Sequence, residues 1–499
     1  MKNKKIFALL LALLFILPIV MACGDGDKTN PDISGGGISG NEETEEVSDP
    51  NARINKKDNL PNDLNFDGQE IRILLPLLNT MDYPEKSTGD IVNDAVYDKN
   101  TRVQERLNVK FSYGELPRGG DWSGALDDMK NMFLAGDDVY DLVSMSLAYC
   151  TYGSVTTVFY MEMQNMPYLD FDQPWWNKGS MLDISHDNKT IKYLVGEASL
   201  SSLAYAGAVF YNKNMYNDVY GDPDSLYGIA LDGKWTFDYL SEKCKGLYVD
   251  VNGDGVADGD DQYGMTFEWW TFYNILCGAG DARRSSRDSD GIIQIDMDLN
   301  RLLTFCEKMY DLCYNNIGVD YYPGTAPLLT PLYLNRQMVF YPLYLHGAMG
   351  FRAMDDDYGI LPLPKIDETQ KEYKSLININ TSVLCVPYTC KIPETVAAVL
   401  EASAAEGYRT VTEVYYEVAL KTKYSRDDYS GQVIDLVNST SYIDFLTTYV
   451  NHLNQSAFIV HQVVSQNKNT DLMSHYTKNE NAYKTSLDKL ITVLTEGIV

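Results

Sequence analysis

Three short apolar runs in the first third of the chain decide the fold. Residues 69–75 read QEIRILL, residues 109–113 read VKFSY and residues 140–145 read YDLVSM. Each run has the length and the β-branched or aromatic content of a buried strand. Between them, residues 90–107 and 122–135 carry apolar side chains at helical spacing. This alternation of strands and helices predicts an α/β fold with a parallel sheet that helices cover.

A second informative stretch, residues 232–270, reads DGKWTFDYLSEKCKGLYVDVNGDGVADGDDQYGMTFEWW. Thr236 has the side chain of an N-cap, and the apolar spacing after it predicts a helix that stops near Gly246. A strand is expected over Gln262–Phe267, and the pair Trp269 and Trp270 follows it.

Between that helix and that strand lies a run of regularly spaced oxygen donors. It reads D-x-N-x-D-G-x-x-D-x-x-D, the spacing of an EF-hand calcium loop, with a glycine at the sixth position where the turn is tight. We therefore predict a structural Ca²⁺ site; the alternative is a solvated acidic turn. Aspartate at position 12 shortens the reach of the last ligand, which indicates a dissociation constant on the order of 10⁻⁴ M. The predicted ligands are Asp250, Asn252, Asp254, the carbonyl of Val256, Asp258 and Asp261.

The N-terminus has the pattern of a secretory signal. Three lysines precede the apolar run Ile6–Leu17, and residues 20–23 read VMAC. This resembles the bacterial lipobox, which implies a signal peptide over residues 1–22 and a lipid on Cys23. An ordinary signal peptide or an uncleaved anchor are the alternatives, but the apolar run is short for a membrane span and is followed by Pro18. Residues 23–65 are rich in Gly, Asp, Asn, Ser and Glu, which predicts a flexible, lipidated tether at the extracellular face of the cell membrane.

Composition excludes several classes of function. At 499 residues the chain is long enough for two lobes, and its net charge of −29 disfavours nucleic acid as a partner. The seven cysteines after Cys23 show no C-x-x-C spacing, and no hydrolase, metalloprotease, P-loop or dinucleotide motif is present. Paired carboxylates for glycoside hydrolysis stay open, because their separation depends on the fold. We expect a protein that is not an enzyme, and we expect a monomer.

The order of several further motifs resembles a known family. PWWN at residues 174–177, a predicted strand over residues 191–195 leading into VGEA, YNK at 211–213 and GKWT at 233–236 follow one another. DYGILPLPK at 357–365 and a helical segment from Pro393 continue the series. This succession resembles extracellular solute-binding lipoproteins of bacterial ABC importers, and most closely the family 1 sugar-binding group of maltose-binding-protein type.

The resemblance implies a two-lobed, periplasmic-binding-protein-like type II fold with crossing hinge strands. By analogy, residues 66–206 and 378–430 form the first lobe, residues 207–377 form the second lobe with the calcium loop 250–261, and residues 431–499 form helices that pack on the lobes. A strand is expected over Asn378–Pro387. A ligand is expected between the lobes, and ABC importer permease subunits are the implied partners.

Sugars need flat apolar surfaces for their rings and polar groups for their hydroxyls. Ligands of such sheets collect at the carboxyl ends of strands. Because side chains alternate along an extended chain, one ring of each tryptophan pair is expected to point inward and one outward, so at most one ring of each pair is expected to face the ligand. The predicted contacts are Trp175, Trp176, Trp269, Trp270, Glu268, Tyr83, Asp82 and Arg352.

The preferred hypothesis is a membrane-anchored receptor that captures a carbohydrate, in particular an oligosaccharide, and delivers it to an importer. The alternatives are a surface glycan-degrading enzyme, or a binding protein for a peptide or another small solute. An adhesion module is disfavoured, because a dockerin-like protein would carry two calcium loops.

Overall fold

A computed structural model describes residues 53–75, 80–115, 122–151, 156–324, 327–351, 354–416 and 428–496. The predicted signal peptide, Cys23 and Arg352 lie outside these residues. None of the helices in the described ranges combines the length and the hydropathy that a membrane crossing requires.

The first lobe is built on a four-stranded sheet with the order β12-β3-β1-β2. β1 runs parallel to both β2 and β3, with Ile73 opposite Tyr113 and Leu142, so the predicted parallel arrangement is confirmed. β12 runs antiparallel to β3 and closes one edge. The elements of this lobe are β1 (Gln69–Leu75), α2 (Ile91–Leu107), β2 (Val109–Glu115), α3 (Trp122–Ala135), β3 (Leu142–Ser146), α4 (Leu147–Cys150), α5 (Lys178–Asp183), α6 (Ser201–Ala204), β12 (Ser382–Cys385) and α13 (Pro393–Glu406).

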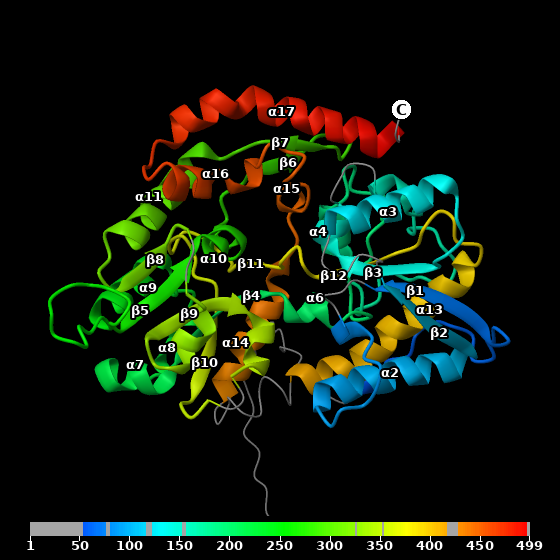
Figure 1. Ribbon diagram of the computed structural model, residues 1–499, viewed down its shortest axis with the longest axis horizontal. Coiled ribbons are helices and arrows are strands. Elements are labelled where there is room, and N and C mark those ends of the chain that lie inside the picture. Colours follow the sequence, from blue (N-terminus) through cyan, green and yellow to red (C-terminus); the bar gives the residue numbers. More distant parts are fainter. Residues whose placement is uncertain are drawn as a thin grey trace, which may run out of the picture. The chain divides into compact units, whose positions relative to one another are not determined.

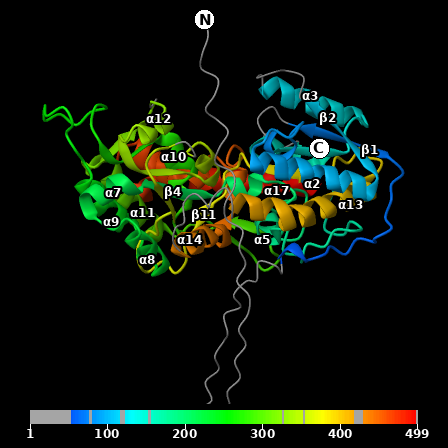
Figure 2. The ribbon, with the colours of Figure 1, turned by 90° about the horizontal axis from the view of Figure 1, so that it is seen from below.

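Local sequence explains where these helices begin and end. The Asp90 side chain caps α2 by accepting hydrogen bonds from the backbone N–H groups of Val92 and Asn93. Asn108 ends the helix in a left-handed conformation that asparagine tolerates. α2 packs beside α13, as Figures 1 and 2 both show.

The second lobe is built on a five-stranded sheet with the order β10-β4-β9-β5-β8. β4 is antiparallel to both of its neighbours, whereas β5 is parallel to β9 and β8. Thr236 caps α9 by accepting from the N–H of Tyr239, as predicted. The elements are β4 (Gly207–Asn212), α7 (Lys213–Tyr220), α8 (Ser225–Leu231), α9 (Phe237–Gly246), β5 (Tyr263–Glu268), α10 (Trp269–Asn274), β6 (Ser285–Arg287), β7 (Ile293–Ile295), α11 (Leu299–Tyr314), β8 (Val319–Tyr322), α12 (Leu329–Leu334), β9 (Met338–Tyr344), β10 (Tyr358–Pro362) and β11 (Ser375–Leu376).

The C-terminal elements add to both lobes. α14 packs on β10 and α8, and β13 pairs with β11. The long helix α17 packs on α11 and buries Tyr483, Leu487 and Leu490 in the core of the second lobe (Figure 1). These elements are α14 (Asp428–Ser439), β13 (Ser441–Tyr442), α15 (Phe445–Thr448), α16 (Ile459–His461) and α17 (Leu472–Glu496).

One predicted strand is absent from the structure and another is shorter than predicted. Residues 191–195 form no strand; only Leu194 pairs with Leu384 of β12 as an isolated bridge. The strand expected over Asn378–Pro387 is confined to β12. In both places the backbone pairs with other segments. The carbonyls of Ile191 and Val195 accept from the N–H groups of Met163 and Asn177, and the N–H of Asn378 donates to the carbonyl of Tyr205.

The predicted tether is wrong for its last residues. Leu60 is buried in the first lobe, and the guanidinium of Arg53 donates to the Glu197 carboxylate at 2.7 Å. Arg106 forms a two-point contact with Asp58, with both N–O distances at 2.7 Å. A few anchoring side chains therefore fix residues 53–65 to the lobe, although their average composition is that of a linker.

Candidate functional site

Trp269 and Trp270 form an exposed aromatic surface at the carboxyl end of β5. Both indoles are substantially exposed, at 37% and 42%, and their centroids lie 5.5 Å apart in an edge-to-face arrangement. Trp270 stacks on Tyr273 at 6.0 Å with an interplanar angle of 24°. The expected alternation of one ring inward and one outward does not occur, because the two residues begin α10 and are not part of an extended strand. Both rings therefore remain available to a ligand.

Glu268 has a structural role beside these rings. Its carboxylate is the N-cap of α10: it accepts from the N–H of Trp270 and, at 2.9 Å, from the N–H and the hydroxyl of Thr271. These bonds hold the two tryptophans at the start of the helix. Glu268 thus positions the aromatic surface, and its predicted role as a polar ligand contact stays a prediction.

His461 lies behind the same surface and is 4% exposed. Its ring lies 6.4 Å from Trp269 and 5.4 Å from Tyr273, measured between centroids. Neither ring nitrogen has a hydrogen-bond partner within the described residues. Burial lowers the pKa of His461 to about 4, because the charged imidazolium would lose its hydration.

A second aromatic group lies where the chain passes between the two sheets. Tyr205 precedes β4, Tyr344 ends β9, and His346 follows it; Tyr205 lies 5.9 Å from Tyr344 and 5.0 Å from His346 between centroids. Asn378 donates its side-chain N–H to the hydroxyl of Tyr344. Sequence reasoning missed this group. The only signal was the position of Tyr205 and Asn378 at the predicted crossing segments.

The structure places Trp175 and Trp176 in the core of the first lobe. They are 0% and 6% exposed, and their indole N–H groups donate to the two carboxylate oxygens of Glu401 at 3.0 and 2.8 Å. Gly196 lies against them, since a Cβ there would meet the Trp175 carbonyl at 2.4 Å. The expectation of one outward ring is therefore wrong for this pair as well. Burial raises the pKa of Glu401 to about 7.

Asp82 and Tyr83 are also buried. Asp82 accepts from the hydroxyl of Ser199 at 2.8 Å and from the backbone N–H of Ser201 at 3.2 Å. The buried ammonium of Lys99 donates to the carbonyl of Ala198 at 2.6 Å. Burial lowers the pKa of Lys99 to about 8, an effect that the nearby Asp82 carboxylate opposes. This network stabilises the turn before α6 and leaves Asp82 no exposed surface for a ligand.

The predicted calcium loop wraps its backbone around Asp250. The two carboxylate oxygens of Asp250 accept from the N–H groups of Gly253 and Gly255 at 2.7 and 2.9 Å, and both glycines have a left-handed φ. Asp261 is buried and accepts from the Tyr248 hydroxyl at 2.9 Å and the Val251 N–H at 3.0 Å. Within the described ranges, no three His, Cys, Asp or Glu side chains are grouped as a metal cluster.

Comparisons with known proteins agree on the architecture. No family model matches the sequence, and neither does any curated protein. Among solved structures, the sugar-binding protein MalE from Xanthomonas citri has a TM-score of 0.57 at 11% identity, over 85% of this chain and 99% of that one. The maltose/maltodextrin-binding domain MalE from Bdellovibrio bacteriovorus, bound to maltotriose, has a TM-score of 0.51 at 12% identity, over 85% and 99%.

The GacH receptor of Streptomyces glaucescens, solved unliganded and with acarbose, has a TM-score of 0.51 at 10% identity, over 84% of this chain and 99% of that chain. At these identities the similarity establishes the fold. The chain therefore has the two-lobed α/β architecture of MalE-type solute-binding proteins, as the order of its sequence motifs predicted.

Proposed function

We propose that this protein is a membrane-anchored extracellular receptor that captures an oligosaccharide between its two lobes and delivers it to an ABC importer. The observation that carries the proposal is the exposed pair Trp269 and Trp270, held by the Glu268 cap at a strand end of a sugar-binding-protein fold. Exposed indole faces match the C–H faces of pyranose rings. The structural neighbours that bind maltotriose and acarbose support this class of ligand.

Delivery to an importer and anchoring through Cys23 rest on the sequence pattern. The lipobox-like residues 20–23 support the anchor, and the fold supports a ligand-dependent change between open and closed lobes. A permease would then recognise the closed form.

The test is a thermal-shift panel of oligosaccharides and peptides on the full chain in a detergent without a sugar headgroup. A true ligand at 100 times its Kd should stabilise the chain by about 2.7 kcal/mol, and chromatography should recover it unchanged. Conversion of any glycan to product would favour the enzyme alternative. Stabilisation by peptides alone would contradict carbohydrate capture.

The contribution of the aromatic surface is tested by Trp270→Ala, which should weaken binding about tenfold because a stacking ring is lost. Trp270→Phe should retain most of the affinity. Tyr429→Ala removes another exposed aromatic ring, on α14, and is the matched control. Equal affinities for Trp270→Ala and Tyr429→Ala would remove the main support for the proposal.

We also propose that loop 250–261 binds Ca²⁺ as a structural ion. Its donors are carboxylate, amide and carbonyl oxygens, the kinds that calcium prefers. The buried Asp261 already joins the end of the loop to Val251 near its start, which supports this fit. The ion would stabilise the connection between α9 and β5 and would not contact the sugar.

A further inference from the structure

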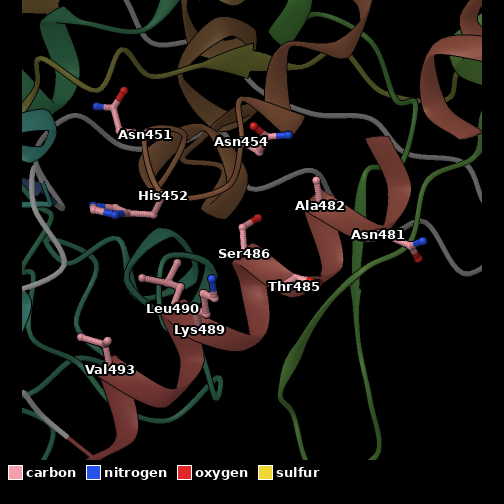
Figure 3. A pocket seen from close by; sticks show the side chains of 10 residues that line it. All are labelled: Asn451, His452, Asn454, Asn481, Ala482, Thr485, Ser486, Lys489, Leu490 and Val493. Carbon is pink, nitrogen blue, oxygen red and sulfur yellow. The ribbon is translucent and has the colours of Figure 1, made fainter. Parts of the chain in front are cut away.

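A pocket of about 700 Å³ lies between α17 and the loop that follows α15 (Figure 3). We refer to it as the α17 pocket. The loop contributes Asn451, His452 and Asn454, and α17 contributes Thr485, Ser486 and Lys489 from one face. This volume is within the range of small-molecule sites in proteins.

The lining of the α17 pocket is suited to hydroxyl groups. The amides of Asn451 and Asn454 form no hydrogen bond within the described residues, and Lys489 forms no ion pair there. Amides and hydroxyls can both donate and accept, as sugar hydroxyls require. No carboxylate is among the described residues that line the pocket, although the chain contains 70 acidic residues. Among the described residues that line the pocket, the only ring is the imidazole of His452 and none is Trp, Tyr or Phe, so a sugar unit would be held there by hydrogen bonds.

The backbone of the loop is held in an uncommon conformation at this point. Asn454 and Gln455 are consecutive non-glycine residues with left-handed φ values of 50° and 56°. Non-glycine residues in this conformation are strained and are found preferentially at binding sites. The N–H of Gln455 donates to Val450 and the N–H of Ser456 to Leu453, so the turn is fixed by its own hydrogen bonds.

One short segment joins the α17 pocket to the strand ends of both lobes. The Nε2 atom of His452 lies 2.9 Å from the carbonyl oxygen of Thr151. Thr151 is the C-cap of α4, the short helix that begins at the carboxyl end of β3. Further along the chain, in α16, the ring of His461 lies behind Trp269 at the carboxyl end of β5. The same segment therefore contributes His452 to the α17 pocket and His461 to the aromatic surface at the carboxyl end of β5, where a ligand of this fold is expected.

On these grounds, and resting on the proposed function, we infer that the α17 pocket is the subsite for a terminal unit of a longer oligosaccharide. The units that stack on Trp269 and Trp270 would be shared by short and long ligands. The terminal unit would bind the amides of Asn451 and Asn454 and the ammonium of Lys489. The protein would consequently prefer long oligosaccharides over disaccharides.

The test is isothermal titration of the full chain with maltodextrins and galacto-oligosaccharides of two to seven units. Asn454→Gly removes the amide and suits the positive φ, so it should not impair folding. Combined with Lys489→Ala, it should weaken binding of the longer glycans about tenfold or more and leave disaccharide binding unchanged. Lys478→Ala, which removes an exposed lysine of α17 outside the pocket, is the control and should bind as the unmodified chain does.

The possible outcomes separate this inference from the proposed function. Unchanged binding of every glycan by the pocket variant, with Trp270→Ala still impaired, would overturn the subsite and leave the proposed function intact. An equal loss for disaccharides, or a similar loss in Lys478→Ala, would contradict the terminal placement. Absence of binding of any glycan by the unmodified chain would overturn both.

Discussion

The guanidinium of Arg287, in the second lobe, donates a hydrogen bond to the backbone carbonyl of Ser185, in the first lobe, at 2.8 Å. The same side chain donates to the carbonyls of Leu182 and Asp183 at 2.9 and 3.1 Å. These carbonyls lie at the end of α5, where a positive charge is favoured by the helix dipole. The hairpin β6–β7 is thereby docked on the first lobe, and the N–H of Ile293 donates to the carbonyl of His186 beside it.

Arg287→Ala should lower the free energy of unfolding by about 2 kcal/mol, because the charge-assisted hydrogen bonds to the three carbonyls at the end of α5 are lost, together with the one to the carbonyl of Gly291. Urea unfolding followed by tryptophan fluorescence measures the change. Arg283→Ala removes a more exposed arginine at the same hairpin, paired with Asp296, and should change the free energy of unfolding by less than about 1 kcal/mol. Equal effects of the two substitutions would show that the α5 contact does not stabilise the chain.

Glu401 should make the protein less stable as the pH rises. Its folded-state pKa of about 7 lies above its ordinary value of 4.5, so ionisation is less favourable in the folded chain. The contribution of the protonated Glu401 side chain to the free energy of unfolding is fully present below about pH 4.5. It falls by roughly 3 kcal/mol as the pH rises through 7. Glu401→Gln, which keeps an oxygen for one tryptophan N–H, should remove this part of the dependence of Tm on pH between 4.5 and 7.5. If Tm depends on pH in the same way in Glu401→Gln and in the unmodified chain, Glu401 is not the group responsible.

His461 should have the opposite effect on the acid side. Burial lowers its pKa to about 4 from an ordinary value of 6.5, so its contribution to stability is present above pH 6.5 and is lost as the pH falls to 4. His461→Phe keeps a ring against Trp269 and cannot be protonated. We expect this variant to retain more of its Tm at pH 4.5, relative to pH 7.5, than the unmodified chain does. Calorimetry at pH 4.5 and pH 7.5 measures the Tm of both proteins. An equal loss of Tm in the variant and the unmodified chain would contradict this role of His461.

Removal of calcium should lower Tm and leave sugar affinity unchanged, because the proposed ion stabilises loop 250–261 and does not contact the ligand. The carboxylate of Asp254 accepts a hydrogen bond from the backbone N–H of Val256, with an N–O distance of 2.7 Å. Asp254→Asn keeps an oxygen for this bond but removes one negative charge from the loop. The difference in Tm between added Ca²⁺ and added chelator should therefore shrink in this variant. A chelator effect on affinity alone would instead place the metal at the ligand site.

Local patterns in the sequence were sufficient for the fold. The apolar runs at residues 69–75, 109–113 and 140–145 correspond to β1, β2 and β3, because buried parallel strands need continuous apolar residues. The helix caps Asp90 and Thr236 could be predicted from the sequence, because a cap side chain accepts hydrogen bonds from backbone N–H groups only two or three residues further along. The order of motifs along the chain identified the two-lobed architecture.

Side-chain exposure was decided by tertiary structure alone. Both tryptophan pairs occur as WW in the sequence, yet Glu401, more than two hundred residues away, pairs with Trp175 and Trp176 and buries them. Trp269 and Trp270 stay exposed because Glu268 caps a new helix at the end of β5. The α17 pocket likewise requires α17 to lie against residues 451–454. The sequence determined the strands, the helices and their order, whereas contacts between distant residues determined which polar and aromatic groups remain free to bind.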